Sequence, residues 1–443
     1  MSEATWDAVV VGAGPSGCAT ATALARAGRK TLLLDRDEKP RFKIGESLLP
    51  FNIPIFEKLG FLPKLKAAAF QEKYGAFFWN ERTGGTRSVV FRTALESPYP
   101  MAYQVQRQRF DGLLAEHAAE SGATVRRGVA ASELVFESGR AVGVKVKSPA
   151  GEELIRSRIV VDATGQAALV ASRMKMRKGD PNLRRAAVYA HYKGVWRPEG
   201  EHGGDILLPF LPDVWYWAIP FSDGTTSVGA VFDPRLAAGR ADDREGLLGD
   251  LLSRSAKMRE LLANAERISP VYATSDYSIT ADRFSGDGWV LVGDAATFLD
   301  PVFSTGVLLG MSAGVRAAAV VDRSLTSKGR VDGADFREYE RVTRNMVARF
   351  RPFVYGYYDT SFTRQFCEKG PDLLERAVTA ILAGNTERPS LRVRFLTRLV
   401  LLAFAWGKLL DRDARNGTVP AGAPQPPDAG VGSEREQRSH AAP

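Results

Sequence analysis

The pattern of hydrophobic positions near the N-terminus predicts a strand, a helix and a second strand in close succession. Residues 7–11 (DAVVV) form a short apolar run, and a glycine-rich turn then leads into the Ala- and Leu-rich segment 19–27. Gly28 is a residue type that commonly ends a helix, and the apolar run TLLL at 31–34 follows it and ends at Asp35. This order is typical of a βαβ unit with two buried parallel strands.

Two kinds of pattern interleave along the rest of the chain. Alternation of polar and apolar positions predicts strands over 73–105, 124–161 and 185–232. The apolar runs IVVDATG and, at 289–293, WVLVG each predict a further buried strand. Helical spacing is found in the segments 109–120, 245–263 and 306–322, and throughout 333–410.

Because these patterns interleave, we expect a mixed α/β fold with two domains that are discontinuous in sequence. A Rossmann-like dinucleotide-binding domain is expected from residues 1–73, 101–183 and 270–332, and a β-sheet substrate domain from 74–100 and 184–269. Residues 333–415 are expected to form a C-terminal helical region. The segment 416–443 is rich in Pro, Gly and Ala and has no apolar periodicity, so we expect it to be disordered.

Composition restricts the cellular setting and the kind of site. The chain has 443 residues and only two cysteines, far apart, which excludes a disulfide framework and a CxxC metal or redox motif, so no metal site is expected. The N-terminus is acidic and lacks the basic start of a signal peptide, which favours the cytoplasm. The longest apolar stretch, Leu399–Trp406, is much shorter than the roughly 20 residues of a membrane span.

The net charge of +9 is concentrated near the C-terminus. Residues 341–415 hold 14 Lys and Arg against 7 Asp and Glu, which predicts a basic face on the helical region. No nucleic-acid-binding motif accompanies it, so we expect no nucleic-acid partner. An acidic protein, a small anionic substrate and a merely solvated surface all remain open as explanations.

A dinucleotide fingerprint lies in the first turn. Gly12, Gly14 and Gly17 form GxGxxG between a strand and a helix, where glycines allow a pyrophosphate to approach the helix N-terminus. Asp35 closes the second strand, where a carboxylate would bind the adenosine ribose, with Arg36 beside it. The strand-to-turn context makes this motif more specific than its glycines alone.

Other segments favour FAD over NAD, because a flavin must also be held far from the first turn. Val161–Gly165 (VDATG) and Gly293–Ala296 (GDAA) resemble two elements of two-dinucleotide-domain flavoproteins, in which an aspartate, here Asp294, contacts the flavin's sugar-phosphate region. Arg107 matches an arginine that faces the cofactor in such proteins. No second GxGxxG with a following acidic residue occurs, so we expect a separate flavin reductase to supply reduced FAD.

Three local patterns resemble the flavin-dependent halogenases. These are Trp215–Pro220 (WYWAIP), the GES segment at 45–47 with Lys73 further along, and Asp300–Gly306 (DPVFSTG) before the long predicted helix. The resemblance implies a fold of the aromatic hydroxylase and halogenase type. It gives Lys73 the catalytic role and places Gly45, Glu46, Ser47 and Gly306 at the cofactor.

The same resemblance implies further roles for residues near the flavin. Backbone N–H groups of Thr305 and Gly306 would bind chloride or bromide at the positive end of the helix. The residues implied to line the passage from flavin to substrate are Trp215, Trp217, Ile219, Pro220 and Phe303. Tryptophan halogenases carry a glutamate where this chain has Phe303, which favours phenolic or pyrrolic substrates over indoles.

By this resemblance, FADH2 reacts with O2 to give a C4a-hydroperoxide, halide attacks it, and the resulting hypohalous acid travels to Lys73, which directs it at an electron-rich aromatic ring. The length resembles halogenases that act on acyl groups tethered to a carrier protein, and the basic helices would suit an acidic carrier. A free phenol or pyrrole remains open. So do an FAD-dependent aromatic monooxygenase, a geranylgeranyl-reductase-like oxidoreductase and a catalytically silent flavoprotein.

Overall fold

The computed structural model describes residues 5–240, 242–275 and 277–416. Its first sheet has the strand order β19-β20-β10-β1-β2-β7, in which β20, β10, β1, β2 and β7 are parallel and β19 is antiparallel to β20. The strands are β1 Trp6–Val11, β2 Thr31–Leu34, β7 Thr124–Arg126, β10 Gly151–Asp162, β19 Ser285–Gly286 and β20 Trp289–Leu291. The predicted apolar runs are therefore confirmed as the centre of a parallel sheet.

Helices cover this sheet. α1 (Pro15–Arg26) begins with Pro15 directly after the glycine turn, where a missing N–H costs nothing, and packs against α8 (Gly306–Lys328) and α4 (Arg107–Glu120).

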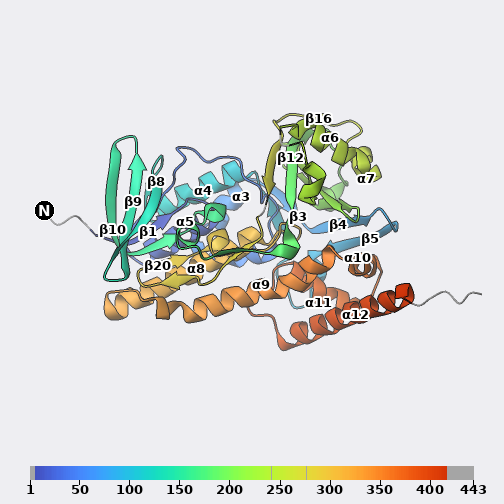
Figure 1. The fold of residues 1–443 in the computed structure, drawn as a ribbon. Helices are drawn as coiled ribbons and strands as arrows, with labels where there is room; N and C mark the ends of the chain where they lie inside the picture. Colours follow the sequence, from blue (N-terminus) through green and yellow to red (C-terminus); the bar gives the residue numbers. More distant parts are fainter. Residues whose placement is uncertain (1–4, 241, 276, 417–443) are drawn as a thin grey trace, which may run out of the picture.

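The N-terminal part of β10 extends beyond the parallel sheet and forms an antiparallel meander with β8 (Ala130–Glu137) and β9 (Arg140–Ser148). Figure 1 shows this meander at the left end of the molecule.

The second sheet has the order β16-β12-β15-β14-β13-β4-β5, with β17 also paired to β12. β13 runs parallel to β4, which brings residues 206–210 beside residues 76–80. Its strands are β4 Gly75–Asn80, β5 Gly85–Val90, β12 Ala186–Lys193, β13 Ile206–Phe210, β14 Val214–Pro220, β15 Thr225–Phe232, β16 Glu266–Arg267 and β17 Tyr272–Ser275.

One face of this sheet packs against two helices, where a single helix over 245–263 was expected. α6 (Arg244–Arg254) and α7 (Ala256–Leu261) are separated by Ser255, which has an extended backbone and accepts a hydrogen bond from the Met258 N–H. A serine in this position caps a new helix, which explains the break. Figure 1 shows the pair beside β12 and β16.

Two small ladders connect these layers. β3 (Gln71–Lys73) pairs with β6 (Ala102–Gln104), and β18 (Ile279–Ala281) pairs with β11 (Arg177–Gly179) and β21 (Thr297–Phe298). Shorter helices fill the connections: α2 Ile53–Leu59, α3 Leu62–Ala67 and α5 Leu169–Arg173.

The C-terminal region was expected to be helical throughout, but it is interrupted. It consists of α9 Arg337–Tyr357, α10 Thr360–Cys367, α11 Asp372–Leu382 and α12 Leu391–Asn416. Asp359 caps α10 and Pro371 precedes α11, so the first two of the three breaks carry local signals in the sequence. Within the described residues no helix is long and apolar enough to cross a bilayer. Asn416, the first residue of the predicted disordered segment 416–443, is the last residue of α12, and the rest of that segment lies outside the described residues.

Candidate functional site

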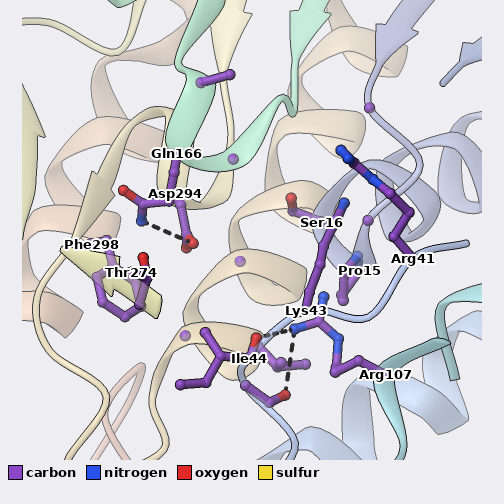
Figure 2. A pocket seen from close by; sticks show the side chains of 18 of the residues that line it. Pro15, Ser16, Arg41, Lys43, Ile44, Arg107, Gln166, Thr274, Asp294 and Phe298 are labelled. Carbon is purple, nitrogen blue, oxygen red and sulfur yellow. Dashed lines mark hydrogen bonds between the residues drawn. The ribbon is translucent and has the colours of Figure 1, made fainter. Parts of the chain in front are cut away.

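A cavity of about 1320 Å³ extends from the glycine turn of the first sheet to the inner face of the second. It is larger than the roughly 300–1,000 Å³ of most small-molecule sites, as an extended dinucleotide requires. Its lining residues come from the two sheets, the 36–47 connection and the N-terminus of α8. Figure 2 shows part of this wall from close by.

Each glycine of the first turn is needed for a different structural reason. Gly12 has φ +106°, and a Cβ added there would meet the Ala163 carbonyl oxygen at 2.4 Å. A Cβ on Gly17 would lie 1.8 Å from the Gly12 oxygen. A Cβ on Gly14, by contrast, would have no protein atom within 4 Å, although Gly14 lines the cavity. Gly14 therefore leaves room for a ligand to approach the backbone at the start of α1.

Asp35 lies where the second strand meets the cavity. Its carboxylate accepts hydrogen bonds from the N–H groups of Ala13, at 3.1 Å, and Asp37, at 3.0 Å, which fix its orientation. Arg36 also lines the cavity, and most of its side chain is exposed. Both side chains are thus positioned at the end of the cavity nearest the glycine turn.

Asp294 and Arg107 face the cavity from opposite sides (Figure 2). Burial raises the pKa of Asp294 to about 6, although Gln166 donates a hydrogen bond to it at 3.3 Å. Arg107 forms an ion pair with Asp111 and donates to the Ile44 carbonyl oxygen at 2.8 Å. The arginine thereby anchors the loop that precedes the GES segment.

Several buried polar atoms on the wall have no partner among the described residues. Glu46 Oε1 lies 3.1 Å from His191 Nε2, but Glu46 Oε2 is unpaired, and so is Thr305 Oγ1. Gly45 (φ +106°) and Ser47 line the cavity on either side of Glu46. Unpaired buried polar atoms are rare in proteins, and a polar ligand along this wall would satisfy them. Together with Gly14 and Asp35, they fit FAD.

The two tryptophans of β14 present their rings on one face of the strand, with ring centroids 5.9 Å apart. Trp215 donates from Nε1 to the Tyr358 hydroxyl at 3.0 Å, and Tyr358 donates to the buried Asp300 carboxylate at 2.9 Å. Trp215, Trp217 and Ile219 line the large cavity; Pro220 is buried at the end of β14 and is not part of its lining. Three of the four β14 residues predicted for the passage therefore line the large cavity, and Pro220 does not.

Lys73 ends β3 and is almost completely buried, with 1% of its surface exposed. Its Nζ donates to Ser47 Oγ at 2.8 Å and to the Leu48 carbonyl oxygen at 3.1 Å, and it lies 5.1 Å from the centre of the Phe91 ring. Burial lowers the pKa of Lys73 to about 7, against an opposing effect of the nearby Asp205 carboxylate. Both protonation states are therefore populated near neutral pH.

Lys73 does not line the large cavity but a small one of about 20 Å³ beside it, with walls shared at Ile206, Val302 and Ser304. The other lining residues of the small cavity are Leu49, Ala76, Phe78, Val89, Phe91, Leu208, Phe303 and Leu382. A cavity of this size holds about one water molecule, so an aromatic ring would enter only after side chains move. Phe303, which was expected to line the passage from flavin to substrate, lines this small cavity instead of the large one.

Asp205 was not anticipated from the sequence. Its Oδ1 accepts hydrogen bonds from the N–H groups of Tyr74, at 2.8 Å, and Gly75, at 2.6 Å, and its Oδ2 lies 2.7 Å from His202 Nδ1. It therefore fixes the junction between β3 and β4, directly after Lys73. Asp205 reaches this junction because β13, which it precedes, pairs with β4. In the sequence it is a lone aspartate before an apolar run, which does not indicate this pairing.

Thr305 and Gly306, the expected halide ligands, begin α8 and line the large cavity. Ser304 before them has φ +58°, which turns the chain into the helix. The first N–H groups of a helix have no partner within it, so this end can accept an anion. Among the described residues no cluster of His, Cys, Asp and Glu could hold a metal ion.

The chain matches the FAD binding domain family over residues 5–348. It is 33% identical to the tryptophan 2-halogenase of Chondromyces crocatus, over 81% of this chain and 68% of that protein. It is 31% identical to a 1H-pyrrole-2-carbonyl peptidyl-carrier-protein brominase of Pseudoalteromonas luteoviolacea, over 81% of this chain and 89% of that one. The structure is similar to that of the myxobacterial chondrochloren halogenase CndH, with a TM-score of 0.76 and 30% identity, covering 88% of this chain and 99% of the other.

Proposed function

Because the chain belongs to the flavin-dependent halogenase family, we propose that it installs chlorine or bromine on an electron-rich aromatic ring and that Lys73 directs the halogen. One observation supports this most. A buried lysine with a lowered pKa lies in a small apolar cavity that shares walls with a cavity large enough for FAD. Such a group can handle a reactive electrophile away from bulk water.

Reduced FAD, when bound, supplies two electrons to O2, so that halide and one proton yield hypohalous acid and water. The aromatic ring then gains the halogen and loses a proton, and the hypohalous oxygen leaves as a second water. The chain's own residues bind the halide, keep water out and aim the electrophile. Thr305 and Gly306 would bind the halide through their backbone N–H groups.

Lys73 would hold the hypohalous acid through its ammonium as a hydrogen-bond donor or through its amine as a haloamine. The Ser47 hydroxyl and the Leu48 carbonyl oxygen fix its Nζ in either case. Val302 and Ser304 line both cavities, so the oxidant passes between them over a short distance. Trp215 and Trp217 line the adjacent wall of the large cavity with their rings 5.9 Å apart, and we propose that they separate the organic substrate from the flavin.

For the substrate we propose a phenol or a pyrrole, either free or tethered to a carrier protein. The cavity at Lys73 is walled by phenylalanines and aliphatic side chains, which suits a flat apolar ring. Phe303 lines this cavity at the position where the resemblance implies a glutamate in tryptophan halogenases, and the names of two relatives specify a pyrrole on a peptidyl carrier. A separate reductase would deliver the reduced flavin, since the sequence holds a single dinucleotide fingerprint.

The test uses the purified FAD-loaded protein with a flavin reductase, NADH and either chloride or bromide, offered a panel of free and carrier-bound phenols and pyrroles. Mass spectrometry should detect the halogen isotope pattern, and omission of the reductase should abolish it. Lys73→Ala should retain FAD and still oxidise reduced flavin, yet form no halogenated product. Lys58→Ala, an exposed substitution on α2, is the control. Hydroxylated product without halide dependence would instead indicate a monooxygenase.

If Lys73→Ala halogenated at the normal rate, the lysine would be misassigned. Lys43, which lines the large cavity, would then be the next residue to replace. Rapid reduction of the bound FAD by NADPH alone would contradict the requirement for a separate reductase.

A further inference from the structure

Helix α12 has apolar side chains on two opposite faces. One face carries Val393, Leu396 and Val400, which are buried where α12 packs against α10 and α11. The other face is exposed and carries Leu391 (79% exposed), Phe395 (61%), Leu399 (39%), Leu402 (65%) and Trp406 (66%). Large apolar residues exposed singly are ordinary, but five on one helix are not.

The spacing of these five residues places them in a line. They are separated by four, four, three and four positions, so on an α-helix they fall on one side within about 80°. From Leu391 to Trp406 the line runs for about 22 Å. Figure 1 shows α12, in red, at an edge of the molecule beyond α10 and α11. The exposed face is thus a straight apolar ridge.

Basic side chains lie beside this ridge on the same helix. Residues 391–408 contain Arg392, Arg394, Arg398 and Lys408 and no acidic residue. Arg392 lies 4.0 Å from Glu96 and Lys408 forms an ion pair with Asp359. Within the described residues, Arg394 and Arg398 have no such partner. By helical geometry these two lie along one border of the ridge and Arg392 along the other.

Two possible occupants of the ridge are disfavoured by composition and charge. Residues 417–443 contain no Leu, Ile, Met, Phe, Tyr or Trp, so they lack large apolar side chains to cover it. A second copy docked through the same ridge would bring arginines against arginines, which is repulsive. A straight ridge with cationic borders is instead complementary to a flat, negatively charged surface.

We propose that the outer face of α12 binds the surface of an anionic membrane. Leu, Phe and Trp side chains would enter the boundary between headgroups and acyl chains, while Arg392, Arg394 and Arg398 contact lipid phosphates. This is the pattern of an interfacial amphipathic helix, which lies on a bilayer without crossing it. The inference does not depend on the halogenation proposed above, because α12 contributes no residue to either cavity.

The test is sedimentation of the full-length, FAD-loaded protein with vesicles of phosphatidylcholine alone or with about a third phosphatidylglycerol. The protein should bind the anionic vesicles and not the neutral ones, and binding should fall as salt rises from about 0.05 to 0.5 M. Arg394→Gln with Arg398→Gln should weaken binding by roughly 25-fold, because each cation contributes about fivefold. A charge-matched control is Arg158→Gln with Lys178→Gln, both exposed and far from α12 in sequence.

The apolar contribution is tested with Phe395→Gln, Leu402→Gln and Trp406→Gln combined. These side chains are exposed, so the variant should fold normally and lose vesicle binding. Replacement of the exposed Trp196 and Leu236 by Gln is the matched control and should bind as well as wild type. Equal binding by the triple variant, or no binding to either vesicle, would overturn the proposal. So would loss of a dimer, or of binding to an acidic carrier protein, caused by the same triple variant without any vesicle binding.

Discussion

Replacement of Lys73 by methionine should change the stability of the protein in a way that depends on pH. Methionine has nearly the same length and no charge, so it removes the cost of burying an ammonium group. It also leaves the Leu48 carbonyl oxygen and the Ser47 hydroxyl without their donor. Lys73 does not line the large cavity, so FAD binding should persist.

The size and sign of the effect follow from the pKa of Lys73, which burial lowers from 10.5 to about 7. Between these two values the unfolded chain binds a proton that the folded protein does not, so stability rises with pH. Below pH 7 both states are protonated, and the folded state carries the whole cost, about 5 kcal/mol from the shift. The lost hydrogen bonds offset roughly 1–3 kcal/mol of this in the variant.

We therefore expect Lys73→Met to be more stable than wild type by about 2–4 kcal/mol at pH 6. This advantage should shrink by about 3 kcal/mol between pH 6 and pH 9, because the buried amine becomes neutral in the wild type. Urea unfolding of both proteins at saturating FAD, followed by tryptophan fluorescence at four pH values, measures the difference. All other titrating groups are common to the two proteins and cancel.

Parallel stability curves for the two proteins from pH 6 to pH 9 would refute this reasoning. They would mean that water reaches the Lys73 ammonium group, or that other groups besides Asp205 stabilise its charge. Halogenated product should be lost from the variant in either case.

Three other changes probe the surroundings of the site. Asp205→Asn removes the carboxylate that favours the ammonium form, so the limb of the product-formation pH profile that reports Lys73 should move to lower pH while flavin oxidation is unchanged. Tyr358→Phe removes the donor to Asp300, whose pKa burial already raises to about 6, so urea unfolding should show a loss of roughly 1–3 kcal/mol that is larger at pH 8 than at pH 5. Gly14→Ala should leave the stability of the FAD-free protein unchanged but weaken FAD binding at least tenfold in a fluorescence titration, because its Cβ would occupy the space for the ligand.

Each of these has a contrary result. An unshifted pH profile in Asp205→Asn would mean that the carboxylate only holds the strand junction. Equal loss of stability at both pH values in Tyr358→Phe would mean that Asp300 does not change its protonation state between pH 5 and pH 8. Normal FAD affinity in Gly14→Ala would mean that the cofactor does not approach this part of the backbone.

The parts of the fold that depend on neighbouring residues could be predicted from sequence. A strand, a glycine turn, a helix and a second strand lie within 7–35, and each carries its own local signal. The break at Ser255 was missed because the apolar spacing continues across it, and only the extended backbone of the serine separates the helices.

Only those residues of the site that belong to recognisable sequence motifs could be predicted. Lys73 was singled out by resemblance, yet its burial and its hydrogen bond to Ser47 arise from the pairing of β3 with β6 and the path of the GES segment. Asp205 is distant in sequence, and the link from Trp215 through Tyr358 to Asp300 joins three separate regions. Such contacts depend on tertiary packing, which no local spacing encodes.

The exposed ridge of α12 was missed for a similar reason. The apolar stretch Leu399–Trp406 is too short for a membrane span, and a sequence with apolar residues on two sides of a helix gives no indication of which side is buried. Packing against α10 and α11 decides this, and it leaves Leu402 and Trp406 outside.

The small cavity at Lys73 takes its walls from both ends of the chain. Leu382, the last residue of α11, lines it, and Phe366 of α10 stacks edge-on against Phe78 at a centroid distance of 5.2 Å. The turn that fits the dinucleotide lies wholly within the first β-α unit. If a substrate ring enters this cavity as proposed, substitutions in α10 and α11 would alter the shape of the ring that fits there and leave the cofactor turn unchanged. Exchange of residues 360–382 between family members would be a modular route to new ring selectivity, without re-engineering of the redox half of the enzyme.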